Sequence, residues 1–200
     1  FLKNIETVPL KNILLKLIKG IQPEYRDHGV NVICTGNINE GKVDVVGANE
    51  IYIKFVDEDF YKKHIDRSAK KNNLVLSMDG EGRGKFAIHE SDLLNIVDSH
   101  VAILKINTDI YNPKFLNYFL NSKIGSEQVK LIETHNKGAM AIQELRLEKI
   151  RIPSISLEEQ DEIVKEVDIN LNAQIEISSE IEEQNLNIEK IFESYITKML

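Results

Sequence analysis

The segment 79–85, Asp-Gly-Glu-Gly-Arg-Gly-Lys, contains the group of side chains in this sequence that is best suited to binding a ligand. Its three glycines allow a backbone to approach a ligand closely, and Arg83 and Lys85 carry charges that bind anions. A nucleotide-binding phosphate loop needs Ser or Thr directly after its lysine, but Phe86 stands there. The residues after Phe86 predict a strand and not a helix. We therefore expect a loop between two strands, and a role in contacting an anion stays open.

Groups for catalysis or metal binding are scarce elsewhere. The five histidines do not have the spacing of a metal site, and we expect each of them, His100 included, at the surface or in a loop. Cys34 is the only cysteine, which excludes an intrachain disulfide and a cysteine-rich zinc site. No nucleophile–base pair is present in the sequence pattern. The sequence therefore predicts a protein that is not an enzyme and that needs neither a cofactor nor a metal.

The formal net charge of −7 conceals an uneven distribution along the 200 residues. Residues 154–200 have a balance of −9, and residues 1–153 have a balance of +2. An acidic tail repels the phosphates of DNA, whereas the first part can accept them if its bases gather on one face. We place a domain boundary near Pro153, with domains at 1–153 and 154–200.

The elements needed to position these groups alternate between short strands and short helices. Helices are expected at residues 8–19, at 112–122 with Asn112 as the cap and Pro113 in the first turn, and at 126–135. Strands, rich in β-branched residues and bounded by Gly, Asn or Asp, are expected at residues 30–35, 51–56, 74–78, 85–89, 100–106 and 147–152. The fold class is α+β, with a mixed, twisted sheet.

The tail is expected to form one long helix. Residues 154–200 contain no Gly or Pro, and Ser156 with Glu159 forms a capping box. A 3–4 spacing, typical of a coiled coil, continues through the whole segment and includes Gln160, Gln174, Ser178 and Asn185 at polar positions. At about 1.5 Å per residue, the helix would span roughly 66 Å, so we expect it to pair with another helix. The alternative is a hairpin folded back onto its own domain. The apolar residues of the predicted seam are Leu157, Val164, Val167, Leu171, Ile181, Ile188, Phe192, Tyr195 and Met199.

No apolar run approaches the length of a membrane span, and no signal pattern is present at the N-terminus. We expect no membrane partner and a cytoplasmic location. The chain begins at Phe1 and not at Met, which leaves open a trimmed chain or a piece of something larger.

Together these segments resemble the specificity subunit of type I restriction–modification systems. The most specific part is the junction in which Pro153 is followed by Leu-Glu-Glu-Gln at residues 157–160 and then by the long helix. The other segments that carry the resemblance are residues 8–13 with 32–38, 74–80 with 84–88, and 97–104 with 115–120.

The resemblance implies a target recognition domain followed by a conserved spacer helix. Such a subunit does no chemistry: it selects the double-stranded DNA site on which modification methyltransferase subunits and a restriction and translocase subunit act. A complete subunit carries two recognition domains and two spacer helices, but this sequence has one of each. Three origins stay open: a half-subunit that pairs as a homodimer or with a second half-subunit, a fragment of a full subunit, and the recognition end of a fused restriction–methylation enzyme. A different class of function, an assembly adaptor that has lost DNA reading, also stays open.

Base reading would come from polar loop residues beside the strands, because Arg and Lys suit guanine, Asn and Gln suit adenine, and acids suit cytosine. The candidates for contacts to bases are Thr35, Asn37 and Asn39 in one loop, Asp79, Glu81, Arg83 and Lys85 in a second, and Asn136, Lys137 and Gln143 in a third. The candidates for contacts to phosphates, which position the protein without specifying sequence, are Lys62, Arg67, Lys70 and Lys71.

Overall fold

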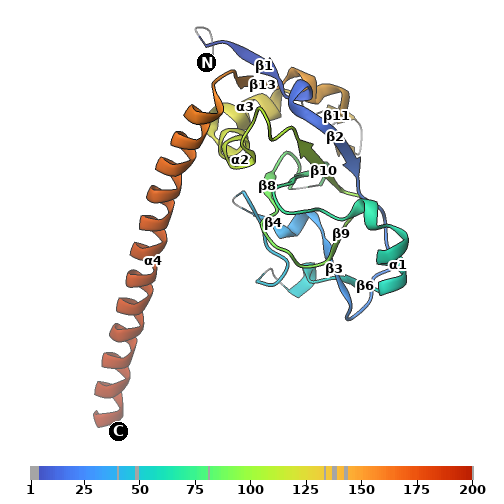
Figure 1. Ribbon diagram of the computed structural model, residues 1–200. Helices are drawn as coiled ribbons and strands as arrows, with labels where there is room; N and C mark the ends of the chain where they lie inside the picture. Colours follow the sequence, from blue (N-terminus) through green and yellow to red (C-terminus); the bar gives the residue numbers. More distant parts are fainter. Residues whose placement is uncertain are drawn as a thin grey trace. The chain divides into compact units, whose positions relative to one another are not determined.

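The computed structural model describes residues 5–39, 41–47, 50–80, 82–132, 134–136, 139–141 and 144–199. They divide into two compact units, Phe1–Gln160 and Asp161–Leu200. The first unit has α+β architecture, as expected, and the second consists of one helix (Figure 1).

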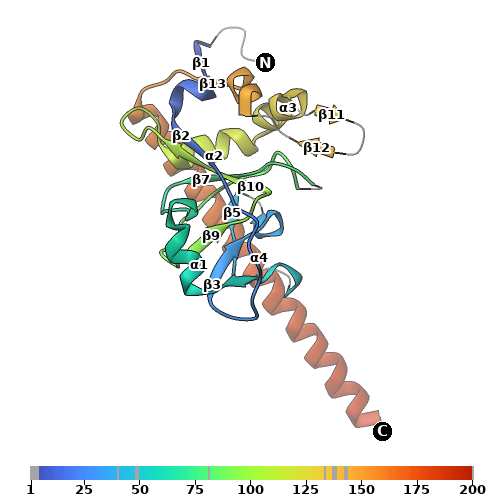
Figure 2. The same ribbon diagram turned by 90° about the vertical axis from the view of Figure 1, so that its right-hand side faces the viewer.

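A six-stranded mixed sheet forms the centre of the first unit (Figure 2). Its neighbours pair antiparallel except β5 and β8, which are parallel. In spatial order the strands are β2 (Leu14–Lys19), β10 (Val101–Ile106), β7 (Leu74–Ser77), β8 (Phe86–Ile88), β5 (Lys42–Val43) and β4 (Ile38–Asn39). The strands predicted at 74–78, 85–89 and 100–106 are confirmed.

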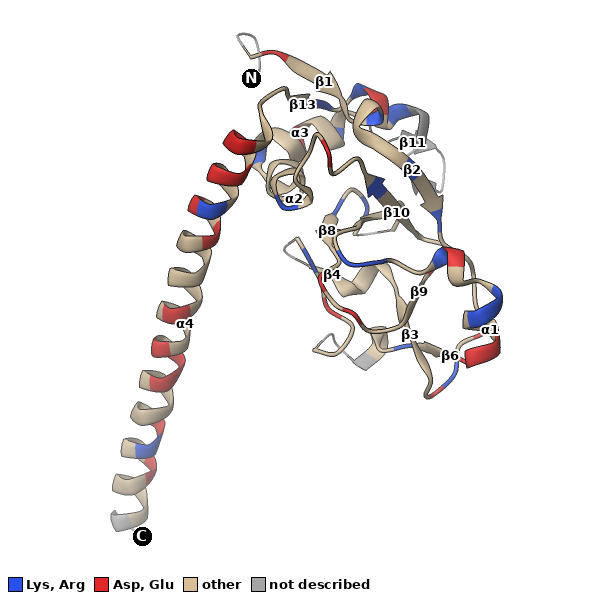
Figure 3. Cartoon of the chain, viewed as in Figure 1, with Lys and Arg blue, Asp and Glu red and all other residues tan. Residues whose placement is uncertain are grey.

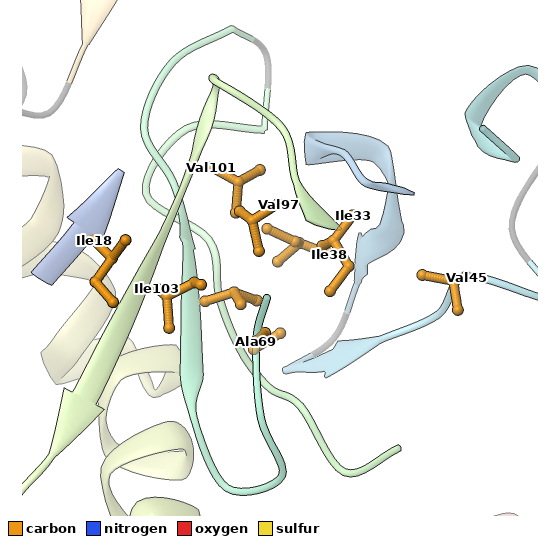
Figure 4. Packing of buried hydrophobic residues seen from close by; sticks show 10 residues of the cluster. Ile18, Ile33, Ile38, Val45, Ala69, Val97, Val101 and Ile103 are labelled. Atoms are coloured by element: carbon orange, nitrogen blue, oxygen red, sulfur yellow. The ribbon is translucent and has the colours of Figure 1, made fainter. Parts of the chain in front are cut away.

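A three-stranded sheet lies beside the first, with β3 (Val30–Ile33) between β6 (Phe55–Val56) and β9 (Asn95–Val97). The short helix α1 (Glu58–Lys63) follows β6. One cluster of buried side chains contains residues from both sheets, so the two sheets share a core (Figure 4). The members that Figure 4 labels on strands are Ile18, Ile33, Ile38, Val97, Val101 and Ile103.

The helix predicted at residues 8–19 is wrong. The segment forms β1 (Thr7–Pro9), a 3₁₀ turn (Leu10–Ile13) and then β2. The turn buries Leu10 and Ile13, and this spacing of three produced the helical pattern. The rest of the segment is extended because β2 pairs with β10, with Ile18 opposite Ile103. Tertiary pairing therefore overrides the local helical preference.

Two other predicted strands are shorter than expected. In residues 51–56 only β6 is extended, after a 3₁₀ turn over Glu50–Tyr52. In residues 147–152 a 3₁₀ helix (Glu144–Lys149) comes first, and β13 (Arg151–Pro153) then pairs with β1. The remaining described pair, β11 (Thr134–Asn136) with β12 (Ala139–Ala141), was not predicted.

The helices after Asn112 are confirmed. Helix α2 (Pro113–Asn121) begins with the Asn112 carboxamide oxygen accepting hydrogen bonds from the backbone N–H groups of Lys114 and Phe115. Helix α3 (Lys123–Ile132) begins three residues earlier than expected. The α2 side chain of Asn117 donates to the Gly41 carbonyl at 2.9 Å, which attaches the helix to the chain just before β5.

Helix α4 (Leu157–Met199) starts at the predicted capping box. The backbone N–H and hydroxyl of Ser156 donate to the Glu159 carboxylate at 2.9 and 2.7 Å, and the Glu159 N–H donates to the hydroxyl at 3.2 Å. The helix is continuous over 43 residues, so the tail does not form a hairpin within itself. Among the described residues, no helix is apolar enough over a sufficient length to cross a membrane.

Gln160 does not lie on an exposed seam, contrary to the predicted pattern, because it is fully buried in the first unit. Its side-chain oxygen accepts from the Asn112 N–H at 2.8 Å, and its nitrogen donates to the carbonyls of Ile110 and Ile155 at 3.1 and 3.0 Å. The side chain therefore joins the first turn of α4 to the segment before α2.

Gln160→Ala should destabilise the protein by about 2 kcal/mol, because it leaves buried backbone groups without partners. Urea unfolding of the full chain measures the loss. Gln184→Ala, an exposed change on the same helix, should alter the unfolding free energy by less than about 0.5 kcal/mol. Equal effects of the two substitutions would contradict the positioning role of Gln160.

Candidate nucleic-acid interface

The glycine-rich segment is a loop between two antiparallel strands, as expected. The loop joins β7 to β8 and is closed by bonds from the Gly84 N–H to the Ser77 carbonyl at 2.8 Å and from the Ser77 N–H to the Lys85 carbonyl at 3.0 Å. Gly80 and Gly84 have φ values of +72° and +80°, a region that side chains with a Cβ rarely adopt. These two glycines therefore permit the tight path of the loop.

The charged residues of this loop differ in their surroundings. The guanidinium of Arg83 donates to the Gly80 carbonyl at 3.2 Å, which holds the side chain across the loop. Lys85 is exposed. Asp79 contacts His100, whose Nδ1 lies 2.8 Å from one carboxylate oxygen, and the contact is an ion pair when the ring is protonated. The His100 carbonyl accepts from the Met78 N–H at 2.8 Å, so strand pairing between β7 and β10 brings the two residues together.

Sequence reasoning treated His100 as an ordinary surface residue and missed this contact. No motif carries it, because Asp79 and His100 lie 21 residues apart and meet only through the pairing of β7 with β10. The bond to Asp79 raises the pKa of His100 above its ordinary value of about 6.5, and partial burial of the ring opposes that rise.

The first predicted loop lies beside the second. A Cβ placed on Gly82 would be 3.7 Å from the Thr35 carbonyl oxygen, so Thr35 is a direct neighbour of the glycine-rich loop. Asn39 is exposed at the end of β4, and its side-chain nitrogen donates to the Gly36 carbonyl at 3.0 Å. Thr35, Asp79, Arg83, Lys85 and His100 therefore belong to one region, which we call the loop cluster.

Asn37 is not a base-reading residue, and that prediction is corrected. Its side chain is fully buried. Its oxygen accepts from the Cys34 N–H at 2.7 Å, and its nitrogen donates to the Asp44 carbonyl at 2.9 Å. These bonds fix the shape of the loop that presents Thr35 and Asn39, so the role of Asn37 is structural.

The phosphate candidates lie apart from the loop cluster. Lys70 and Lys71 precede β7, whereas Arg83 and Lys85 lie on the loop beyond its other end. The four residues of β7, at about 3.3 Å each, span roughly 13 Å between the ends from which the two groups extend. Figure 3 shows Lys and Arg distributed over several elements of the first unit, and mainly acidic charge on α4.

The remaining phosphate candidates, Lys62 and Arg67, have acidic partners within the chain. Lys62 lies on α1, where its ammonium is 3.1 Å from the Glu58 carboxylate. Arg67 pairs with Asp66 at 3.1 Å and also donates to the carbonyl of Lys19 at the end of β2.

Several candidates cannot be placed. Glu81, Lys137 and Gln143 lie outside the described residues, and Asn136 is described only as part of β11.

The described residues contain no group of His, Cys, Asp and Glu side chains suited to a metal. Burial raises the pKa of Cys34 to about 11, so its thiol is protonated at neutral pH and a poor nucleophile. Nearby Tyr25 donates a hydrogen bond to Asp98, which is itself buried.

Comparison with models of known protein families identifies the family of the chain. The family model for the type I restriction modification DNA specificity domain matches residues 16–186. The chain belongs to this family. The resemblance found in the sequence is therefore confirmed, and the protein is a DNA specificity domain of the type I restriction–modification kind. Members of this family are generally not catalytic.

Solved structures support the fold. The HsdS subunit of Thermoanaerobacter tengcongensis has a TM-score of 0.60 at 19% identity, covering 88% of this chain and 44% of that one. A structure concerning complex assembly and conformational transition of the type I R-M system gives 0.58 at 18%, covering 86% and 39%. The S subunit of M. genitalium gives 0.55 at 17%, covering 88% and 43%. The chain thus spans less than half of each of these chains. No curated protein matches it.

Proposed function

We propose that this specificity domain reads one half of a bipartite DNA site without catalysis, and that partner methyltransferase and restriction subunits act at the site it selects. The observation that carries the proposal is the loop cluster: the glycine-rich loop between β7 and β8 and the loop that begins at Thr35, after β3, are separated in sequence but are neighbours, and they carry polar and charged groups. Hydrogen-bonding side chains on fixed loops suit contact with base edges in the major groove. Membership of the specificity-domain family supports DNA as the ligand.

The second part of the proposal concerns α4, which we infer pairs with the helix of a second copy in antiparallel orientation. Ile181, Ile188, Phe192 and Tyr195 are between 51% and 65% exposed within the chain, an apolar surface that a soluble helix normally covers. Near the C-terminal end the surface widens, because Ile191 and Ile196, which the predicted seam omitted, are also exposed. An antiparallel pair would hold two reading units at a distance set by helix length.

Retention of DNA tests the proposed function. A gel-shift experiment would use the full chain and pooled random duplexes, with and without the partner methyltransferase. We expect a subset of duplexes to be retained and enriched over repeated rounds. Assembly with the methyltransferase but no retention of any duplex would contradict DNA reading and favour an assembly adaptor.

Arg83→Ala should weaken binding to the preferred site by about 1–3 kcal/mol and relax the preference at one base position. The reason is that Arg can donate two hydrogen bonds to guanine, which alanine cannot replace. Competition binding with the preferred duplex and its single-base variants measures both effects. Equal losses on preferred and random DNA would remove Arg83 from the reading residues.

Lys70→Ala supplies the matched comparison, because this exposed lysine is a candidate for a phosphate contact. We expect it to weaken all sequences alike and to lower the slope of log affinity against log salt by about one. Affinity measured at several salt concentrations tests this. A loss confined to the preferred sequence would contradict the assignment of Lys70 to phosphate.

A further inference from the structure

We propose that His100, held by Asp79, is a further DNA contact of the loop cluster, and that the ring takes up a proton at Nε2 when DNA binds. DNA recognition would then strengthen as the pH falls. The inference rests on the proposed DNA-reading function and adds to it a contact residue and a pH dependence.

The geometry fixes which ring nitrogen is available. The two oxygens of Asp79 lie 2.8 and 2.9 Å from Nδ1 of His100. A carboxylate at this distance favours a proton on Nδ1 in both charge states of the ring. Nε2 is therefore the nitrogen that titrates: it accepts a hydrogen bond in the neutral ring and donates one in the cation.

The pair is accessible to a ligand. The side chain of His100 is 54% exposed and that of Asp79 is 37% exposed. Both backbones are fixed, because His100 immediately precedes β10 and its carbonyl accepts from the Met78 N–H. The ring is thus a positioned group at the edge of the loop that carries Arg83 and Lys85.

The charges around the ring favour the protonated form. Two carboxylates act on it, Asp79 from the β7–β8 loop and Asp98 from the turn before β10. Asp98 is buried and accepts bonds from the Tyr25 hydroxyl and from the backbone N–H of His100. Arg83 and Lys85 are the cations on the same loop as Asp79.

The ligand chemistry follows from the charge of the pair. With a neutral ring the Asp79–His100 pair has a charge of −1, and with a protonated ring it is neutral overall. A polyanion therefore binds the protonated pair better, and by linkage DNA binding promotes protonation. The N–H at Nε2 suits a hydrogen-bond acceptor on DNA, either the edge of guanine or a phosphate oxygen.

The test is DNA affinity as a function of pH. Fluorescence anisotropy of the full chain, with the partner methyltransferase present, would be measured between pH 6 and 8.5 at constant salt. We expect affinity to rise by about three- to tenfold as the pH falls through the titration of His100, since one proton taken up gives at most tenfold per pH unit. His100→Gln should abolish this dependence, and His28→Gln, at an exposed histidine in another loop, should keep it.

Asp79→Asn gives a second arm, because loss of the carboxylate should move the pH dependence to lower pH. His100→Gln measured on preferred and random duplexes distinguishes the two acceptors. If His100 contacts a base, the substitution weakens binding to the preferred duplex only. If it contacts a phosphate, the substitution weakens binding to both duplexes. An unchanged pH dependence in His100→Gln would overturn the inference. Absence of DNA binding at every pH would instead contradict the proposed function.

The free energy of unfolding, measured without DNA at two pH values, tests whether the Asp79–His100 pair forms. Because the pKa of His100 is raised in the folded protein, the pair stabilises the fold fully below about pH 6.5, and the contribution is lost as the pH rises through the folded pKa. Wild type should therefore exceed His100→Gln in stability by more at pH 6 than at pH 8.5. A difference that did not change between the two pH values would show that protonated His100 gains nothing from Asp79 in the folded protein.

Discussion

Deletion of residues 172–178 should shorten the spacer of the recognised site by about three base pairs while leaving the bases unchanged. Seven helical residues at about 1.5 Å each span about 10 Å, and one base pair spans about 3.4 Å. Removing a full heptad keeps the residues before and after the deletion on the same face of α4, so pairing is preserved. In an antiparallel pair the helix length is the distance between the two reading units.

Methylome mapping in cells that carry the variant and its partner methyltransferase measures the spacer directly. The matched control deletes residues 172–173 only, which rotates the C-terminal half of the helix by about 200°. We expect this control to lose pairing and not to define a new spacer. A heptad deletion that left the spacer at its original length would show that α4 does not set the distance.

Replacing Ile181 and Ile188 together by Asp should weaken pairing by at least about 100-fold. Both side chains are more than half exposed in the chain and lie on the predicted seam. In a paired helix they would be buried, and burying an unpaired carboxylate costs several kcal/mol. Sedimentation equilibrium of the full chain measures the dimer dissociation constant, and circular dichroism checks that the helix remains.

Ile175→Asp is the matched control for that variant. Ile175 is 57% exposed, as the seam isoleucines are, but it lies outside the predicted seam. We expect it to leave the dimer within a few-fold of wild type. An equal loss for both variants would mean that general apolar character, and not the predicted seam, drives association.

The sequence predicted the elements whose signals are local. The Asn112 cap with Pro113 and the capping box of Ser156 and Glu159 appear where expected, because each satisfies the free N–H groups at a helix start through neighbours in sequence. The helix predicted over residues 14–19 was wrong for the opposite reason. These residues pair with β10, which lies more than 80 residues away, and this pairing decides their conformation.

The loops of the candidate site were predictable from the sequence, but the surroundings of the individual residues were not. The glycine-rich loop and the loop beginning at Thr35 were both identified, and the structure brings them together. Residue type alone does not show that Asn37 points into the core, where it bonds the backbone of its own loop. Nor does it show that His100 meets Asp79, because this contact depends on the register in which β7 pairs with β10.

The most direct measurement is the sequence of the duplexes that the chain retains from a random pool, with its partner methyltransferase present. The account predicts one short motif that occurs twice in inverted orientation at a fixed separation, because two identical reading units are held by one pair of helices. A single motif with no second copy at a constant distance would contradict it.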